Sequence, residues 1–193
     1  MDLTEIFQNV RPKGNPPLPI ELFEGAAQFE LASVLLAKHA QKVVESDGSH
    51  FQSQQQAIFV NAAFALELYL KCIFFNEKGY LPEKTHDLKK LFGLIVAASR
   101  NRVRELFDEE ILKCSGLNLI WIATHDSSTG KPLLTIELVL DHGSEAFEEF
   151  RYQFEGVKAK TIWVAGPAVM ACRRFLLELH PEWIKRIDPF FGV

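Results

Sequence analysis

The chain has 193 residues, and its 21 basic and 25 acidic side chains give a formal net charge of −4. This length suits one domain whose core needs no disulfide or metal to hold it. The acidic balance excludes a bulk positive field that would attract nucleic acid or an anionic membrane. The 16 phenylalanines indicate a packed core or a large interface.

The cysteines and the N-terminus indicate a reducing compartment. Cys72, Cys114 and Cys172 lie far apart, and none forms a CxxC pair or lies at ligand spacing from a histidine. We therefore expect no metal and no cofactor. The N-terminus lacks the basic start and apolar run of a signal peptide, and polar residues interrupt every apolar run before a membrane-spanning length. A cytoplasmic protein without a membrane segment is expected.

The first half of the chain predicts an arm followed by two long helices. Residues 1–19 are expected to form an extended N-terminal arm, because prolines fix φ and remove backbone donors. A helix follows, and Gly48 ends it. Its apolar side repeats every seven residues and comprises Leu22, Phe29, Leu36 and Val43. Residues 53–78 predict a second helix that is apolar on nearly every side and therefore central.

The second half predicts four more helices and one ambiguous stretch. Thr85 and Asp87 mark the start of a third helix, and Ser99 caps a fourth that runs to about Cys114. Residues 117–140 hold two apolar, partly β-branched stretches around a turn-like loop, which fits either a hairpin or helical pieces. Helical periodicity returns at Ser144 and again after Gly166-Pro167, and it stops at Pro181.

Three segments are similar, in order and spacing, to segments of a known family of helical domains. They are 63–71 with Glu67 and Lys71 four apart, 85–92 with His86-Asp87-Leu88, and 147–155 with Arg151-Tyr152. Together they resemble the HEPN (higher eukaryotes and prokaryotes nucleotide-binding) family over roughly residues 20–180.

The resemblance implies an all-α, up-and-down helical bundle of about five to six helices, with residues 20–193 as a single HEPN-like domain. It favours helix over hairpin for residues 117–140. It also implies a homodimer and biology around RNA, which in this family covers toxin ribonucleases, abortive-infection systems and inert partners of nucleotidyltransferases.

Ribonucleases of this family use an arginine followed, after four to six residues, by a histidine near the last helices. RNA is cut without metal when an acid–base group moves the 2′-hydroxyl proton and a cation stabilises charge on the phosphate. Here the candidates are Arg173 or Arg174 with His180, and on a continuous helix Arg173 and His180 would share a face about 10 Å apart. The structural alternative is that His180 complements the C-terminal dipole of the helix.

Two further sets of residues are candidates for binding. Arg151 and Tyr152 are not followed by a histidine at the required distance, so Arg151 is either a phosphate or nucleotide contact or a member of an ion pair. A basic stretch between residues 100 and 113 also contains several acidic residues, so it indicates a solvated charged face and not an RNA-binding surface. It comprises Arg100, Arg102, Arg104 and Lys113.

Glu67, Lys71, His86 and Asp87 form the second set. They are either a nucleotide site or a group of helix-stabilising pairs and caps. The sequence leaves open whether the protein is an enzyme. It predicts a HEPN-like binding module, non-catalytic or weakly catalytic, in an RNA-linked or phage-defence (toxin–antitoxin or abortive-infection) context. The alternatives are a metal-independent endoribonuclease and a structural subunit that partners a nucleotidyltransferase.

Overall fold

A computed structural model describes residues 17–47, 51–114, 134–151 and 165–191. Of these residues, 86% are helical and none is in a strand, which confirms the predicted all-α helical bundle. The seven described α-helices are α2 (Pro19–Asp47), α3 (Phe51–Lys78), α4 (Leu88–Leu94), α5 (Ala97–Cys114), α7 (Ile136–Arg151), α8 (Gly166–Leu179) and α9 (Ile184–Phe191). A single 3-10 turn, η2 (Pro181–Trp183), joins α8 to α9.

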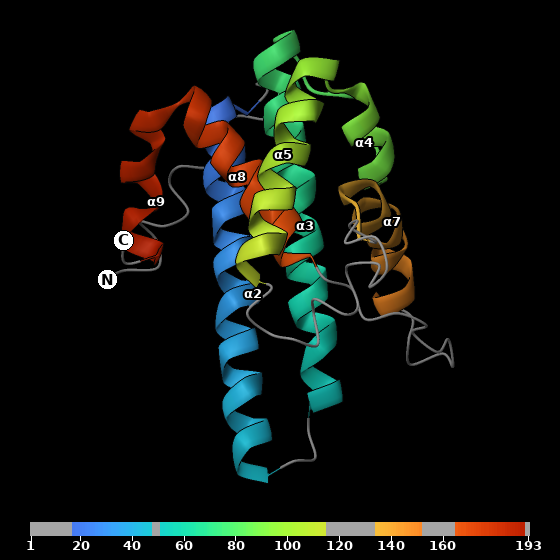
Figure 1. The fold of residues 1–193 in the computed structure, drawn as a ribbon, viewed down its shortest axis with the longest axis vertical. Coiled ribbons are helices and arrows are strands. Elements are labelled where there is room, and N and C mark those ends of the chain that lie inside the picture. Colours follow the sequence, from blue (N-terminus) through green and yellow to red (C-terminus); the bar gives the residue numbers. More distant parts are fainter. Residues whose placement is uncertain (1–16, 48–50, 115–133, 152–164, 192–193) are drawn as a thin grey trace, which may run out of the picture.

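Helix α3 is the centre of the bundle. It runs antiparallel to α2 in a long hairpin, and it also contacts α4, α7 and α8 (Figure 1). Leu66, Tyr69 and Leu70 are fully buried along it. The part of α3 between Gln56 and Lys78 is long and apolar enough to cross a membrane, but the core helix of a bundle meets the same criterion. Burial against four helices accounts for its apolar character on nearly every side.

Helix α2 buries a wider side than its seven-residue repeat predicts. The buried positions in its first turns are Leu22, Phe23, Ala26, Ala27 and Glu30. Phe29, which the repeat placed inside, is 36% exposed and stacks on Phe64 with ring centroids 5.1 Å apart. The difference arises because α2 contacts α3 on one side and the C-terminal helices on another, where the Trp183 ring lies 5.1 Å from Phe23.

Helix α7 begins inside the stretch that the sequence left ambiguous. It starts at Ile136, eight residues before the predicted start at Ser144, and it buries Ile136, Val139 and Leu140 against α3 and α4. The hairpin interpretation is therefore wrong for residues 136–140. They are helical, and the buried side chains, three and four residues apart, lie on the side of α7 that faces the core. Residues 117–133 lie outside the described part of the chain.

The prediction that helical structure stops at Pro181 is wrong, because η2 starts there and α9 follows from Ile184 to Phe191. The other boundaries lie close to the predicted ones. Helix α2 starts at Pro19, α4 starts directly after Asp87, and α5 starts at Ala97, two residues before the predicted cap Ser99. Of the predicted arm, residues 1–19, the first 16 lie outside the described part of the chain.

Candidate functional site

Arg173, one of the two predicted catalytic cations, forms a buried ion pair with α2. Its guanidinium Nη1 lies 2.9 Å from Oε1 of Glu30, and the Tyr69 hydroxyl on α3 donates to Oε2 of the same carboxylate at 2.8 Å. Glu30 is only 5% exposed; burial raises its pKa, and Arg173 acts in the opposite direction. Burial, followed by the Glu30 carboxylate, raises the pKa of Tyr69 well above its ordinary value. One charge-assisted network thus joins three helices.

Arg174, the neighbouring cation, points to α5. Its guanidinium pairs with Glu110 and, at 2.7 Å, with Glu109. Lys113 also contacts the Glu110 carboxylate, at 2.7 Å. Burial acts to raise the pKa of Glu110, but its bonds to Lys113 and Arg174 outweigh burial and lower the pKa below its usual value. Arg174 is therefore one of two cations that neutralise a carboxylate on α5.

His180, the predicted acid–base group, is held at the junction of α8 and η2. Its ring stacks on Trp183 with centroids 4.0 Å apart and planes 9° from parallel. Its Nε2 lies 2.8 Å from Oδ1 of Asn76 on α3, and its Nδ1 lies 3.4 Å from Glu182. The Asn76 amide donates to the Cys72 carbonyl at 2.9 Å, so its oxygen is the atom that faces His180 and accepts from Nε2–H.

These three side chains have three different sets of partners. Arg173 is tied to α2 and α3, Arg174 to α5, and His180 to α3 and η2. A general acid–base group and a phosphate-binding cation need to face one reacting centre. Within the described part of one chain, the contacts direct Arg173, Arg174 and His180 to separate neighbours.

The predicted ligand residues Glu67, Lys71 and His86 come together where the segment before α4 lies against the second half of α3. The Glu67 carboxylate is almost fully buried; it pairs with Lys71 through Oε1, and its Oε2 lies 3.0 Å from Nδ1 of His86. The His86 side chain is 73% exposed. The arrangement places an imidazole at the surface with a buried carboxylate behind it, a pairing that fixes the orientation of the ring.

Asp87, the fourth member of that set, caps a helix. Its carboxylate accepts from the backbone N–H of Lys90 at 2.8 Å and from the Ser144 hydroxyl at 3.2 Å. The Ser144 oxygen in turn accepts from the backbone N–H of Leu88 at 2.9 Å. Asp87 therefore caps α4 and attaches it to α7, and both contacts are made by its Oδ1.

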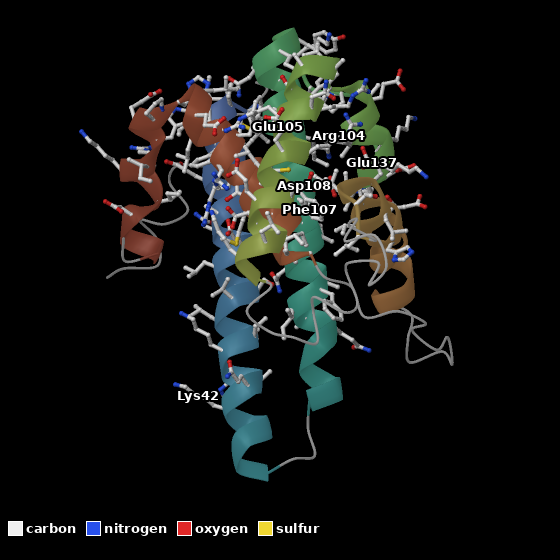
Figure 2. All side chains as sticks on the ribbon, in the orientation of Figure 1. Lys42, Arg104, Glu105, Phe107, Asp108 and Glu137 are labelled. Atoms are coloured by element: carbon white, nitrogen blue, oxygen red, sulfur yellow. The ribbon has the colours of Figure 1, made fainter. Side chains whose placement is uncertain are left out.

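The remaining predicted residues are Arg151, Tyr152 and the basic stretch on α5. Arg151 is the last residue of α7, but its side chain and Tyr152 lie outside the described part of the chain. The basic stretch on α5 is paired almost throughout, and Arg104 and Glu137 lie next to each other between α5 and α7 (Figure 2). The pairs are Arg102 with Glu105 and Glu178, Arg104 with Glu137, and Lys113 with Glu110. This stretch is a paired surface, which supports the predicted charged face.

Sequence reasoning missed the buried acids that these arginines contact. Glu30 shares a side of α2 with Phe23, Ala26 and Ala27, at the spacing of three, four and seven residues that marks a buried helical face. A carboxylate on such a face needs a partner, and that requirement was the available signal. Glu110 gave no comparable signal, because it follows the acidic pair Asp108-Glu109.

Among the described residues there is no cluster of three or more histidine, cysteine or acidic side chains able to hold a metal ion. The Cys72 and Cys172 thiols are buried, and burial raises the pKa of each to about 12. No family model, curated protein or solved structure matches the chain.

Proposed function

We propose that the protein is a HEPN-like helical binding module without ribonuclease activity. The observation that carries the proposal is the separate engagement of Arg173, Arg174 and His180 by buried or stacked partners. A ribonuclease that used these groups would have to separate the buried Arg173–Glu30 ion pair before the Arg173 guanidinium could contact a phosphate. Leaving one member of such a pair buried without its partner costs about 3–5 kcal/mol.

The binding site in this proposal is the surface around His86. The Glu67 carboxylate orients the imidazole. The segment from Lys78 to Lys90 carries four lysines and two carboxylates, a formal balance of +2, which falls to +1 when Asp141, the partner of Lys89 at 2.9 Å, is included. The four lysines are exposed: Lys78, Lys84, Lys89 and Lys90. Such a local positive excess favours a phosphate-bearing ligand. The ligand class is therefore a nucleotide or the end of an RNA strand.

The biological setting rests on the family resemblance. It comprises an RNA-linked or phage-defence role, a cytoplasmic homodimer, and a nucleotidyltransferase as one candidate protein partner. A homodimer would place two such surfaces on one particle.

The test is binding of a fluorescent ATP analogue and of a labelled single-stranded RNA, followed by anisotropy in low salt. His86→Ala is expected to weaken binding about tenfold, since a hydrogen bond to a charged group is lost. His39→Ala is the matched control, because His39 is an exposed histidine on the distant α2. Equal affinity of the two variants, or no binding by the wild type, would contradict the proposed site.

A further inference from the structure

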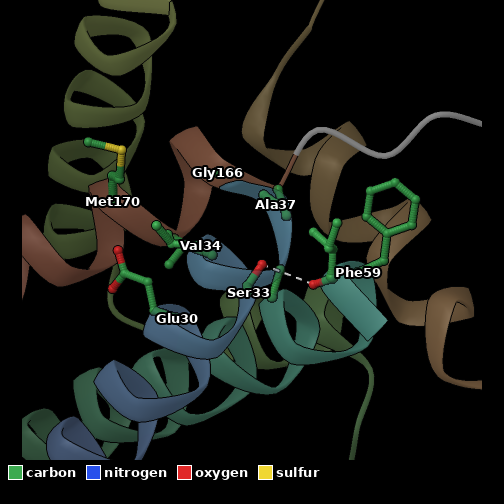
Figure 3. A pocket seen from close by; sticks show the side chains of 11 residues that line it. Glu30, Ser33, Val34, Ala37, Phe59, Gly166 and Met170 are labelled. Atoms are coloured by element: carbon green, nitrogen blue, oxygen red, sulfur yellow. Dashed lines mark hydrogen bonds between the residues drawn. The ribbon is translucent and has the colours of Figure 1, made fainter. Parts of the chain in front are cut away.

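A cavity of about 340 Å³ lies between α2, α3 and the start of α8 (Figure 3), and His86 is not among the residues that line it. Its walls are mostly apolar side chains, among them Val34, Ile58, Phe59, Ala62, Val169 and Met170. The space opens to solvent beside Val34, Ala37 and Gly166, which are exposed. Small-molecule sites usually measure about 300–1,000 Å³. Its volume is therefore that of a ligand site.

Water in this space gains few hydrogen bonds from the walls. Because the space is open to solvent, its waters are free to return to the bulk, and burying an apolar body against apolar walls in their place is favourable. The polar side chains that line the cavity are Glu30 and Ser33. The Ser33 hydroxyl already donates to the Ile58 carbonyl at 3.0 Å, the contact drawn as a dashed line in Figure 3. The walls therefore favour an apolar body.

The polar end of the cavity offers acceptors without a strong net charge. The Glu30 carboxylate accepts one bond at each oxygen, from Arg173 and from Tyr69. A carboxylate has about four acceptor positions, so it has capacity for a further donor. The Arg173 guanidinium balances its charge, which removes the need for a cationic ligand.

We propose that this cavity binds a small, neutral, largely apolar molecule with a single N–H or O–H donor. The donor bonds to Glu30, and the apolar body lies between Val34 on α2 and Val169 on α8. This proposal goes beyond the proposed function, because it concerns different residues and does not depend on nucleotide binding at His86.

Two adjacent residues of α2 provide a matched pair of variants. Val34 lines the cavity and is 36% exposed, so a larger side chain there has room to extend into the space. Leu35 is 55% exposed and is not part of the lining. Val34→Phe should fill the cavity, whereas Leu35→Phe adds a ring on the neighbouring surface.

The probe is N-phenyl-1-naphthylamine, a neutral aromatic molecule with one N–H donor whose fluorescence rises in apolar surroundings. Saturable binding to the wild type and to Leu35→Phe is expected, with affinity at least about tenfold lower for Val34→Phe. The same skeleton with a sulfonate, 8-anilino-1-naphthalenesulfonate, should bind more weakly than the neutral probe, because its charge would lie among apolar walls and beside a carboxylate.

Three results would overturn the proposal: no saturable binding, equal affinity for Val34→Phe and the wild type, or tighter binding of the sulfonated probe. If circular dichroism shows that Val34→Phe is unfolded, Gly166→Leu replaces it. Gly166 lines the cavity, and a Cβ added there meets no atom within 4 Å. Nucleotide binding measured on the same preparation keeps a failure here separate from a failure of the His86 site.

Discussion

At the scale of single residues, burial separates ion pairs that look alike in the sequence. Arg173 and Arg102 each contact a glutamate on another helix. The side chains of Arg173 and Glu30 are 18% and 6% exposed, whereas those of Arg102 and Glu178 are 38% and 41% exposed. Removing one member of a buried pair leaves a charge without compensation in a poorly solvated place, while water replaces a lost partner at the surface.

Arg173→Met is therefore expected to lower the free energy of unfolding by about 3–5 kcal/mol. Arg102→Met is the control and should lose far less. Without Arg173, burial raises the pKa of Glu30 against only the smaller, opposite effect of the Tyr69 hydrogen bond, so this pKa in the folded variant lies further above its value in the unfolded chain. A carboxyl with a raised folded-state pKa destabilises the fold as pH rises through that value. The deficit of Arg173→Met should consequently shrink as pH falls from about 7 towards 5, measured by urea unfolding; equal losses in the two variants would contradict this account.

The contribution of Glu110 to stability is expected to depend on pH in the opposite direction. Its bonds to Lys113 and Arg174 hold its pKa below the ordinary value of 4.5 in the folded protein. The stability it contributes is thus present above that pH and is lost as pH falls through the lower, folded-state pKa. The melting temperature of the wild type should fall more steeply than that of Glu110→Gln between about pH 5 and 3. Glu105→Gln, on an exposed side of α5, should follow the wild-type slope, and parallel curves for all three proteins would contradict the assignment.

At the scale of elements, the helix ends follow local chemistry. Asp87 begins α4 because its carboxylate accepts the backbone N–H of Lys90, as the position before a helix favours. Gly79 ends α3 with φ of 76°, a left-handed value that side chains disfavour. Gly93 lies inside α4, and it is not among the positive-φ glycines of the described residues. A Cβ meets no atom within 4 Å at either glycine, so only backbone conformation separates them.

Gly79→Ala is therefore expected to destabilise the protein by about 1 kcal/mol, because alanine resists a positive φ. Gly93→Ala should leave the stability unchanged or raise it by up to about 1 kcal/mol, because alanine is the better helix former. Chemical denaturation of both variants measures the difference. Destabilisation of the same size at both positions would show that φ is not the cause.

Elements were more predictable than the contacts between them. Caps and glycine stops depend on neighbouring residues, so the end of α3 was predicted correctly and the start of α4 lay within two residues of prediction, whereas α5 starts three residues before the position that a cap at Ser99 implies. The start of α7 was missed because the apolar, β-branched stretch 134–140 has no periodicity long enough to distinguish strand from helix. The partners of Arg173, Arg174 and His180 were missed because Glu30, Glu110 and Asn76 lie far away in the sequence.

At the scale of the whole molecule, the antiparallel pair of α2 and α3 forms the spine of the described bundle. Helix α9 lies beside α2, helices α4 and α7 lie beside α3, and α8 crosses the pair between α3 and α5 (Figure 1). The lower parts of α2 and α3 extend beyond the other helices. Arg173, Arg174 and His180 lie along α8 and its end, and each is fixed to a different neighbour. In this arrangement they help to hold α8 against α2, α5 and α3, which is a structural role.

The most direct test of that role is incubation of the purified protein with total RNA in excess chelator, beside a His180→Ala variant whose fold is verified by circular dichroism. The account predicts no RNA cleavage by either protein, because His180 is held by Asn76 and Trp183 while the neighbouring arginines are neutralised. Cleavage by the wild type that disappears in His180→Ala would contradict it and would establish a metal-independent ribonuclease.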